Sequence, residues 1–291
     1  MEVIRSISDL QSRADAERAA GRRLALVPTM GALHRGHLSL LDVARERADC
    51  VWVSIFVNPT QFDDPADLAG YPSTWESDLE ACRAAGVEVV FAPAADEMYP
   101  DGAETRVEVE ELSKPLCGAT RSGHFRGVTT IVAKLLLAAK PHVAVFGEKD
   151  FQQLAVIRRM VRDLNIDVEI VAGPTVREAD GLALSSRNLR LDDAARVQAV
   201  ALSRALDAAE RAVLAGERDA DAILALARAE LAKAPRARID YLELRDPEAL
   251  GRAPDRLEGP TLLALAVFME PGAEPGEVVR LIDNRVLRPR D

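Results

Sequence analysis

The chain has 291 residues, 48% of them hydrophobic, which is enough for one large domain or two modest ones and argues against disorder. Its 47 acidic residues outnumber its 37 basic residues, and the formal charge of -10 argues against a nucleic-acid or anionic-membrane surface. Cys50, Cys82 and Cys117 are widely scattered without a C-x-x-C motif, which indicates neither a disulfide framework nor a thiolate zinc site and favours a reducing compartment.

The N-terminus leads from residues 1–5 directly into a charged, Ala-rich stretch that predicts a helix over residues 9–20. Ser8 or Asp9 can cap this helix, and Gly21 suits its end. The start lacks the apolar core of a signal peptide, and no window approaches ~20 uninterrupted apolar residues. We therefore expect a cytoplasmic protein with no membrane partner.

Strands and helices alternate along the N-terminal part of the chain. Residues 24–27 form a short apolar strand, a helix begins near His37, and the apolar run 51–57 is typical of a strand buried on both faces. This order predicts a βαβ unit. A helix over residues 75–85, capped by Thr74, and a strand over residues 87–91 continue the pattern.

Residues 92–126 carry Pro, Gly and charge without clear periodicity, so we expect a long excursion of the kind that is more often functional than idle. After it the alternation resumes. A helix is predicted over residues 128–139, a strand over 142–146, a helix over 151–164 and a strand over 166–171. The alternation predicts an α/β, Rossmann-like, doubly wound parallel sheet.

The composition changes after Arg190. Residues 192–234 are rich in Ala, Arg, Leu and Glu at helical spacing and predict two helices separated at Gly216. Three strand-like runs follow at residues 239–244, 262–268 and 280–282. We therefore expect a Rossmann-like domain over residues 1–175 and a smaller α+β domain over residues 176–291.

In an open parallel sheet, ligands bind beyond the carboxyl ends of the strands. After the first predicted strand, His34 and His37 lie three residues apart at a helix start, where free N–H groups and the helix dipole stabilise a phosphate. Gly31 and Gly36 allow close approach of the backbone to a ligand. The alternative is a glycine-containing turn with two surface histidines.

Two further strand ends are polar. Asn58 and Gln61 offer neutral amides suited to hydroxyls or a carboxylate, although Asn-Pro-Thr-Gln is also ordinary turn chemistry. Residues 147–150 place a cation and carboxylates after a glycine at a helix start, which could also be a cap.

The last strand end is followed by Ser185, Ser186 and Arg187, whose hydroxyls and planar guanidinium form a compact phosphate clamp. A simple Ser-Ser-Arg turn is the alternative. Four such ends in one sheet indicate a nucleotide and a small polar acid bound side by side.

The segment His34-Arg35-Gly36-His37, together with Leu184-Ser185-Ser186-Arg187, resembles the paired signature of the nucleotidyltransferase superfamily. Within it, the segments PTMGALH (28–34), FVNPTQF (56–62), FGEKDFQQ (146–153) and READGLA (177–183) closely resemble the pantothenate synthetase family. The likeness runs from about residue 24 to 190 and continues through residues 241–244 and 281–284, which is nearly the whole chain.

The resemblance implies a ligase that condenses pantoate with β-alanine, using ATP and Mg²⁺, through a pantoyl-adenylate, in a homodimer. The family positions at the ATP site correspond to Met30, Gly31, Ala32, Leu33, His34, Arg35, Gly36, His37, Gly147, Glu148, Lys149, Asp150, Val176, Leu184, Ser185, Ser186 and Arg187. The positions expected at pantoate or β-alanine are Gln61, Gln153, Asn58 and Arg121.

The same resemblance implies that His37 is the acid catalyst and that His34 and Lys149 hold the phosphates, with Ser186 and Arg187 completing the catalytic set. Arg121 and His124 lie where the family has a mobile wall over the site. Asp78 is the candidate to contact the Mg²⁺, directly or through water.

The chain departs from the family pattern at a few places. Leu184 stands where many relatives carry Met, Ser77 replaces an acidic residue beside Asp78, and residues 269–277 are richer in Pro and Gly than the usual turn. Two alternatives remain at this point: a nucleotidylyltransferase of the same superfamily acting on another small acid or phosphate, and a non-catalytic nucleotide-binding module.

Overall fold

The computed structural model describes residues 1–62, 68–271 and 277–290. It divides into two compact units. The first comprises Met1–Glu148 and Gln152–Pro174, and the second comprises Lys149–Phe151 and Thr175–Asp291. The chain therefore enters the second unit briefly at residues 149–151 and returns to it at residue 175.

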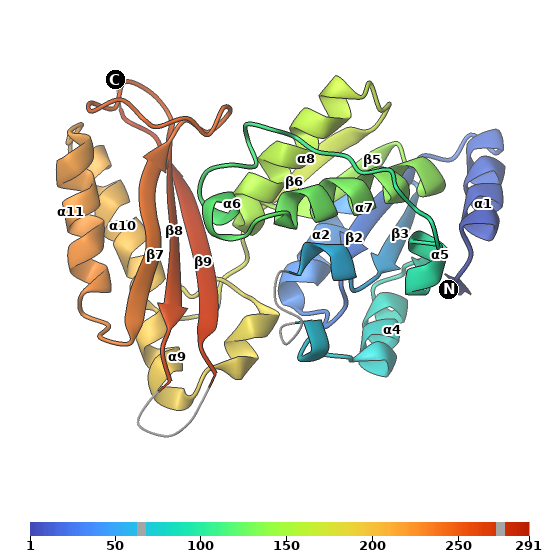
Figure 1. The fold of residues 1–291 in the computed structure, drawn as a ribbon, viewed down its shortest axis with the longest axis horizontal. Coiled ribbons are helices and arrows are strands. Elements are labelled where there is room, and N and C mark those ends of the chain that lie inside the picture. The colour runs from blue at the N-terminus through green and yellow to red at the C-terminus, as the bar shows by residue number, and fades with distance from the viewer. Residues whose placement is uncertain (63–67, 272–276, 291) are drawn as a thin grey trace. The chain divides into compact units, whose positions relative to one another are not determined.

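The first unit is built on a parallel sheet with the strand order β1-β4-β3-β2-β5-β6. Figure 1 labels β2, β3, β5 and β6 of this sheet. Its strands are β1 Glu2–Ile4, β2 Leu24–Thr29, β3 Cys50–Ile55, β4 Val89–Phe91, β5 Val143–Gly147 and β6 Glu169–Gly173. The doubly wound parallel sheet expected from the alternation of elements is confirmed.

The order of the strands reverses between β2 and β5. From β2 the chain adds β3 and then β4 on one side, whereas β5 pairs with the other side of β2 and is followed by β6. Such a reversal opens a crevice outside the carboxyl ends of the two strands, which is the usual place for a ligand in this architecture. The segments after β2 and β5 are those that the sequence singled out.

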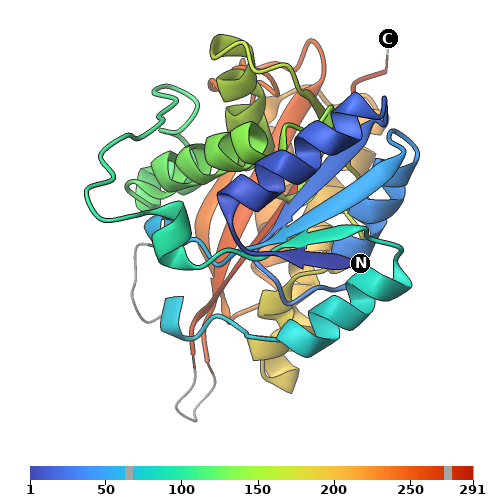
Figure 2. The same cartoon turned by 90° about the vertical axis from the view of Figure 1, so that its right-hand side faces the viewer.

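Helices cover both faces of the sheet (Figure 2). On one face, α1 (Ile7–Ala19), α7 (His124–Ala139) and α8 (Phe151–Asp163) enclose a core that includes Trp52 and Phe91. On the other face lie α2 (Arg35–Arg45) and α4 (Trp75–Ala84). Because both faces are covered, the central strands are apolar throughout, as expected for a parallel sheet.

Some boundaries in the first unit differ from the prediction. The strand β1 was not expected; it pairs in parallel with β4 at the edge of the sheet. The helix α1 begins earlier, because Ser6 caps it by accepting a hydrogen bond from Asp9 N (3.1 Å). The excursion contains the short helices α5 (Ala95–Met98) and α6 (Cys117–Thr120), and α7 begins at His124.

The second unit is a three-stranded antiparallel sheet with helices, as expected for a small α+β domain. Its strands are β7 Ala237–Arg245, β8 Thr261–Met269 and β9 Val279–Leu287, with β8 in the middle. The helices are α9 Asp193–Ala199, α10 Ala201–Leu214 and α11 Ala220–Leu231. A second, separate apolar core joins the helices to the sheet.

The first predicted helix of this unit is in fact two, because the chain turns at Val200 between α9 and α10. Most of the unusual stretch 269–277 lies outside the described residues. No helix in the described ranges is long and apolar enough to cross a membrane.

Candidate active site

The turn that follows β2 has an unusual backbone that a buried carboxylate holds in place. Gly31 and Ala32 both have positive φ angles, 87° and 50°. Asp78 of α4, which is 3% exposed, accepts hydrogen bonds from Ala32 N (2.9 Å) and Leu33 N (2.8 Å). Thr74 Oγ1 adds a third hydrogen bond to Asp78 (3.0 Å). The carboxylate therefore fixes the main chain that leads into α2.

These partners do not fit the expectation that Asp78 is a magnesium ligand. Both of its oxygens already accept hydrogen bonds from protein groups. In the part of the chain that the structure describes, no group of three or more His, Cys, Asp or Glu side chains could hold a metal ion. Asp78 is thus an anchor for the loop, and no step of the chemistry is assigned to a metal at this residue.

His34 and His37 cap the start of α2 reciprocally. Gly36 N donates to His34 Nδ1 (3.1 Å), and His34 N donates to His37 Nδ1 (3.2 Å). Their ring centroids are 4.1 Å apart. Because both Nδ1 atoms accept from backbone N–H groups, the proton of each neutral ring is on Nε2. The two predicted histidines therefore lie together and carry their ring N–H donors on the side away from the helix backbone.

Gln61 lies at the end of a single 3-10 turn, η1 (Pro59–Gln61), and its side chain is held by Asn58. Asn58 Nδ2 donates to Gln61 Oε1 (3.0 Å) and to Gly127 O (3.1 Å). Its Oδ1 accepts from Thr60 Oγ1 (3.0 Å) and from Tyr99 Oη (2.8 Å). Asn58 is 1% exposed, so it positions Gln61, which differs from the prediction that it binds the acid directly.

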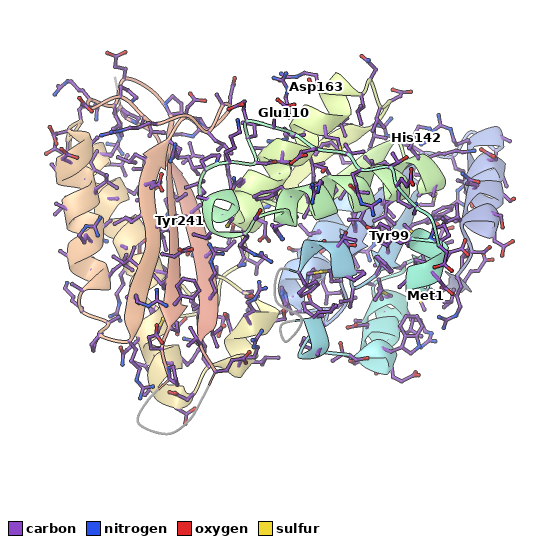
Figure 3. The ribbon with its side chains drawn as sticks, in the orientation of Figure 1. Met1, Tyr99, Glu110, His142, Asp163 and Tyr241 are labelled. Carbon is purple, nitrogen blue, oxygen red and sulfur yellow. The ribbon has the colours of Figure 1, made fainter. Side chains whose placement is uncertain are left out.

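Tyr99, labelled in Figure 3, is half-buried at the end of α5. Burial raises the pKa of its phenol above the ordinary 10.0, although hydrogen bonds to Thr60 and Asn58 oppose this change. The hydroxyl therefore stays protonated at neutral pH and remains a donor to Asn58.

The main-chain carbonyl of Gln61 is also held. His124 Nδ1 lies 2.7 Å from Gln61 O, and Arg121 Nη2 donates to the same oxygen (3.2 Å). Since a carbonyl only accepts, His124 carries its proton on Nδ1; its Nε2 can then accept from Arg121 Nη1 (3.3 Å). The structure thus brings Arg121 to Gln61, another residue predicted near β-alanine or pantoate.

Gln152, which precedes the predicted site residue Gln153, holds part of the excursion of residues 92–126 in place by hydrogen bonds. Gln152 Nε2 donates to Leu112 O (3.0 Å) and Pro115 O (2.6 Å), and its Oε1 accepts from Cys117 N (3.0 Å). Gln152 is buried, whereas the neighbouring Gln153, expected at pantoate, is half-buried on α8. The two adjacent amides therefore have different environments.

The predicted phosphate clamp of the second unit follows a tight hairpin-like loop. Arg177 pairs with Ala183 in an antiparallel bridge, and Leu184 N donates to Val176 O (2.9 Å). Gly181 turns the loop with a φ of 95°. These contacts deliver Ser185, whose Oγ caps the 3-10 helix η3 (Ser186–Arg190) by accepting from Arg187 N (3.3 Å).

Charged side chains fix the outside of this loop. Asn188 Nδ2 donates to Glu178 Oε1 and to Ala183 O, both at 3.0 Å. Arg196 bridges Glu178 (2.7 Å) and Asp180 (2.8 Å). Burial alone would raise the pKa of Asp180, but its hydrogen bonds with Leu182 N and Arg196 outweigh this effect and lower the pKa. The loop is therefore held by ion pairs as well as by main-chain bonds.

The residues predicted to bind ATP, pantoate or β-alanine divide between the two units. The first unit contains Met30, Gly31, Ala32, Leu33, His34, Arg35, Gly36, His37, Asn58, Gln61, Arg121, Gly147, Glu148 and Gln153, and the second contains Lys149, Asp150, Val176, Leu184, Ser185, Ser186 and Arg187. Lys149 lies in the 3-10 turn η2 (Glu148–Asp150) directly after β5. Its carbonyl accepts from Asn284 Nδ2 of β9 (2.9 Å).

Sequence reasoning assigned no site role to Tyr99, Gly127, Gln152, Asp283 or Asn284, which hold site residues or the segments next to them in place. The resemblance covers Gln152, Asp283 and Asn284 without giving them a role, and a glycine at a helical pattern, such as Gly127, often has a packing reason. A Cβ atom there would lie 2.3 Å from Thr60 O, so α7 packs directly on the turn that carries Gln61.

Comparison with known proteins identifies a family over the whole chain. A model described as pantoate-beta-alanine ligase matches residues 2–286. The pantothenate synthetase of Syntrophobacter fumaroxidans is 50% identical over 289 residues, which cover 99% of either chain. That of Geotalea daltonii is 52% identical over 287 residues, again 99% of both chains.

Solved structures agree with the sequence relatives. The pantothenate synthetase of Thermus thermophilus has a TM-score of 0.91 at 42% identity and covers 99% of this chain and 100% of its own. The pantoate-beta-alanine ligase of Francisella tularensis, solved with beta-gamma ATP and beta-alanine, has a TM-score of 0.79 at 33% identity, covering 98% and 97% of the two chains. The chain therefore belongs to the pantoate-beta-alanine ligase family.

Proposed function

We propose that this chain joins pantoate to β-alanine in an ATP-dependent ligation through pantoyl-adenylate. A pantoate carboxylate oxygen attacks the α-phosphorus of ATP, and the bond to the β-phosphate oxygen breaks to release pyrophosphate. The β-alanine amine then attacks the acyl carbon, AMP leaves, and the amine loses a proton to give pantothenate. The match over residues 2–286 carries this proposal, because it spans both units and every predicted site segment.

The ring N–H donors of His34 and His37 supply the electrostatic part of the first step. Negative charge develops on the α-phosphate and on the leaving pyrophosphate, and donors that are already oriented stabilise it without reorganisation. The reciprocal capping bonds at Nδ1 orient both rings before ATP arrives. We assign the proton delivered to the leaving group to His37 Nε2.

Lys149, Ser186 and Arg187 bind the phosphates in this proposal, with main-chain atoms of Val176 and Leu184 beside the nucleotide. Arginine offers a planar fork for two phosphate oxygens, while lysine acts as a point charge. Gln61 and Gln153 hold the hydroxyls and carboxylate of pantoate, and Gln61 also faces β-alanine. Neutral amides suit this role because they bind an acid without lowering its nucleophilicity by a formal positive charge.

Mg²⁺ enters the proposal only with ATP, since this ion commonly binds through substrate phosphates, and we assign no residue of the chain to it. A homodimer in the cytoplasm is the proposed state of the protein. The family resemblance supports the use of Mg²⁺ with ATP and the homodimer.

Isotope transfer tests the chemistry directly. With pantoate labelled by ¹⁸O in its carboxylate, attack on the α-phosphorus leaves one labelled oxygen on AMP after the amide forms, and the phosphorus NMR signal of AMP shifts. Pantoate and ATP without β-alanine should also exchange labelled pyrophosphate into ATP. Label that remains wholly in pantothenate would contradict the adenylate, and a product that keeps the nucleotide would identify a nucleotidylyltransferase instead.

The variant His37→Asn tests the role of the Nε2 donor. Asparagine places its Oδ1 close to the position of Nδ1, so it can still accept the hydrogen bond from His34 N, but it has no counterpart of Nε2–H. We expect pyrophosphate exchange to fall by about 10²–10³ with little change in pantoate affinity. Exchange within a few-fold of the wild-type rate would remove His37 from the catalytic set.

A further inference from the structure

The strand β9 carries two adjacent polar residues, Asp283 and Asn284, that contact different phosphate-binding segments of the second unit. Successive side chains of a strand project to opposite faces of the sheet. Asp283 shares the side of the buried Leu281, and Asn284 projects from the other side. One face of the strand therefore reaches the loop before the Ser-Ser-Arg clamp, and the other reaches Lys149.

On the first side, Asp283 grips Arg177 with two hydrogen bonds, Nη1 to Oδ2 (2.6 Å) and Nη2 to Oδ1 (2.9 Å). The Asp283 side chain is 1% exposed. Arg177 Nη1 also donates to Gly181 O (3.0 Å) at the tip of the loop. Burial lowers the pKa of Arg177, but the hydrogen bonds and charge of Asp283 outweigh it and raise the pKa, so the guanidinium remains charged.

This ion pair orients the clamp through the main chain. The loop closes by the bridge between Arg177 and Ala183 and continues directly into Ser185. A buried ion pair is expensive to desolvate, and replacing one with apolar residues is often neutral for stability. The geometry at Arg177 is therefore better explained by the fixed position that it gives the loop than by a gain in folding energy.

On the second side, Asn284 Nδ2 donates to the main-chain carbonyl of Lys149 (2.9 Å). Residues 149–151 belong to the second unit, although the residues on both sides of them belong to the first. Lys149 is thus placed with the unit that contains Ser185, Ser186 and Arg187.

We propose that Asp283 and Asn284 are a positioning pair that holds Lys149 and the Ser185–Arg187 clamp at a fixed separation on one frame, the strand β9. This role rests on the proposed ligation, in which both segments bind ATP phosphates. Donors fixed in advance stabilise the developing charge without reorganisation, and a displacement of about 1 Å can cost 10²-fold in rate. Neither residue of the pair touches ATP; each acts through a different cation.

The experiment is a crossed set of double variants. Asn284→Ala removes the donor to Lys149 O, and Asp283→Asn weakens the grip on Arg177. Each is measured alone, with Lys149→Ala and with Arg187→Ala, by pyrophosphate exchange and by calorimetric binding of pantoate and of ATP. Asn284→Gln, which keeps an amide donor, tests rescue. Asp240→Asn is the matched control, because it breaks an ion pair with Arg280 in the same sheet at a distance from either loop in sequence.

We expect Asn284→Ala to lower exchange by about 10- to 100-fold, with unchanged pantoate affinity and partial recovery in Asn284→Gln. When Asn284→Ala is added to Lys149→Ala, exchange should fall by less than about twofold further. When it is added to Arg187→Ala, the full effect of Asn284→Ala on exchange should persist. Asp283→Asn should show the opposite pattern. If Asp283→Asn fails to fold, Arg177→Lys replaces it in the experiment, since lysine keeps the charge but cannot make the bidentate contact with Asp283.

Three results would overturn the positioning pair: equal effects in all backgrounds, a loss in Asp240→Asn as large as in Asn284→Ala, or wild-type exchange in Asn284→Ala. Failure of the ligation itself is a separate result, because the wild-type chain would then show no exchange. In that case the same crossed pattern should still appear in the ATP affinities measured by calorimetry. If it is absent from those affinities, the proposal of a positioning pair is also overturned.

Discussion

His142, which precedes β5 and is labelled in Figure 3, is a neutral hydrogen-bond acceptor in the folded chain. Leu24 N donates to its Nδ1 (3.0 Å), and a proton on that atom would break this bond. Burial lowers the pKa of His142 below its ordinary 6.5; the charges of Arg18 and Arg23 act in the same direction, against Asp167 and Asp49. The unfolded chain therefore binds this proton more tightly than the folded chain.

The consequence is a loss of stability in mild acid. The free energy of unfolding should rise with pH from the lowered folded pKa up to 6.5, and the contribution of His142 should disappear as the pH falls through that window. Denaturant unfolding at about pH 5 and about pH 7.5 measures this difference. His142→Asn, which keeps an acceptor without titrating, should flatten it, and an unchanged pH profile in this variant would assign the dependence to other groups.

The sequence indicates candidate site residues by type, but it does not reveal the contacts that fix the role of each. The histidines of the first turn and the Ser-Ser-Arg clamp could be named because their chemistry is tied to phosphate and their spacing is local. Asn58 was taken for a ligand because a polar residue after a strand suits either role, and Asp78 was taken for one because the family resemblance implies Mg²⁺. Their distant partners are Gly127, 69 residues along the chain from Asn58, and Ala32, 46 residues from Asp78, and no local pattern reveals these two.

At the scale of elements, the start of α7 is packed against η1 without space for a side chain. A Cβ atom on Gly127 would lie 2.3 Å from Thr60 O and 2.8 Å from Gln61 N. Gly127→Ala must therefore displace the turn that carries Gln61. We expect a loss of about 1–3 kcal/mol in the free energy of unfolding, together with weaker pantoate binding measured by calorimetry.

Gly251→Ala is the matched control, since nothing lies within 4 Å of its Cβ position. It should leave both stability and pantoate binding close to wild type. Gly127→Ala with normal pantoate affinity would show that the turn can move without disturbing Gln61.

The element boundaries that escaped prediction share a physical reason. β1 is three residues long, too short for an alternating pattern, and its partner β4 lies more than 80 residues away. The division between α9 and α10 falls at Val200 inside a continuous Ala-rich helical pattern, without Gly or Pro to announce it. In both cases tertiary packing, which the local sequence does not encode, decides the boundary.

For the whole molecule, the alternation of elements was sufficient for the fold class. Apolar strands between amphipathic helices allow few arrangements other than a doubly wound parallel sheet, and the change of composition after Arg190 correctly announced the antiparallel unit. The alternation of elements does not reveal that residues 149–151 group with the second unit, where Lys149 O accepts a hydrogen bond from Asn284, 135 residues further along.

That membership matters for recombination between relatives. A chimaera joined at the boundary between residues 174 and 175 takes Lys149 from one parent and its anchor, Asn284, from the other, although both belong to the same unit. A crossover between residues 148 and 149 keeps these two residues from one parent but separates β5 from β6, its partner in the sheet. The two structural units of this protein therefore do not correspond to the two segments that a single crossover in the linear sequence would produce.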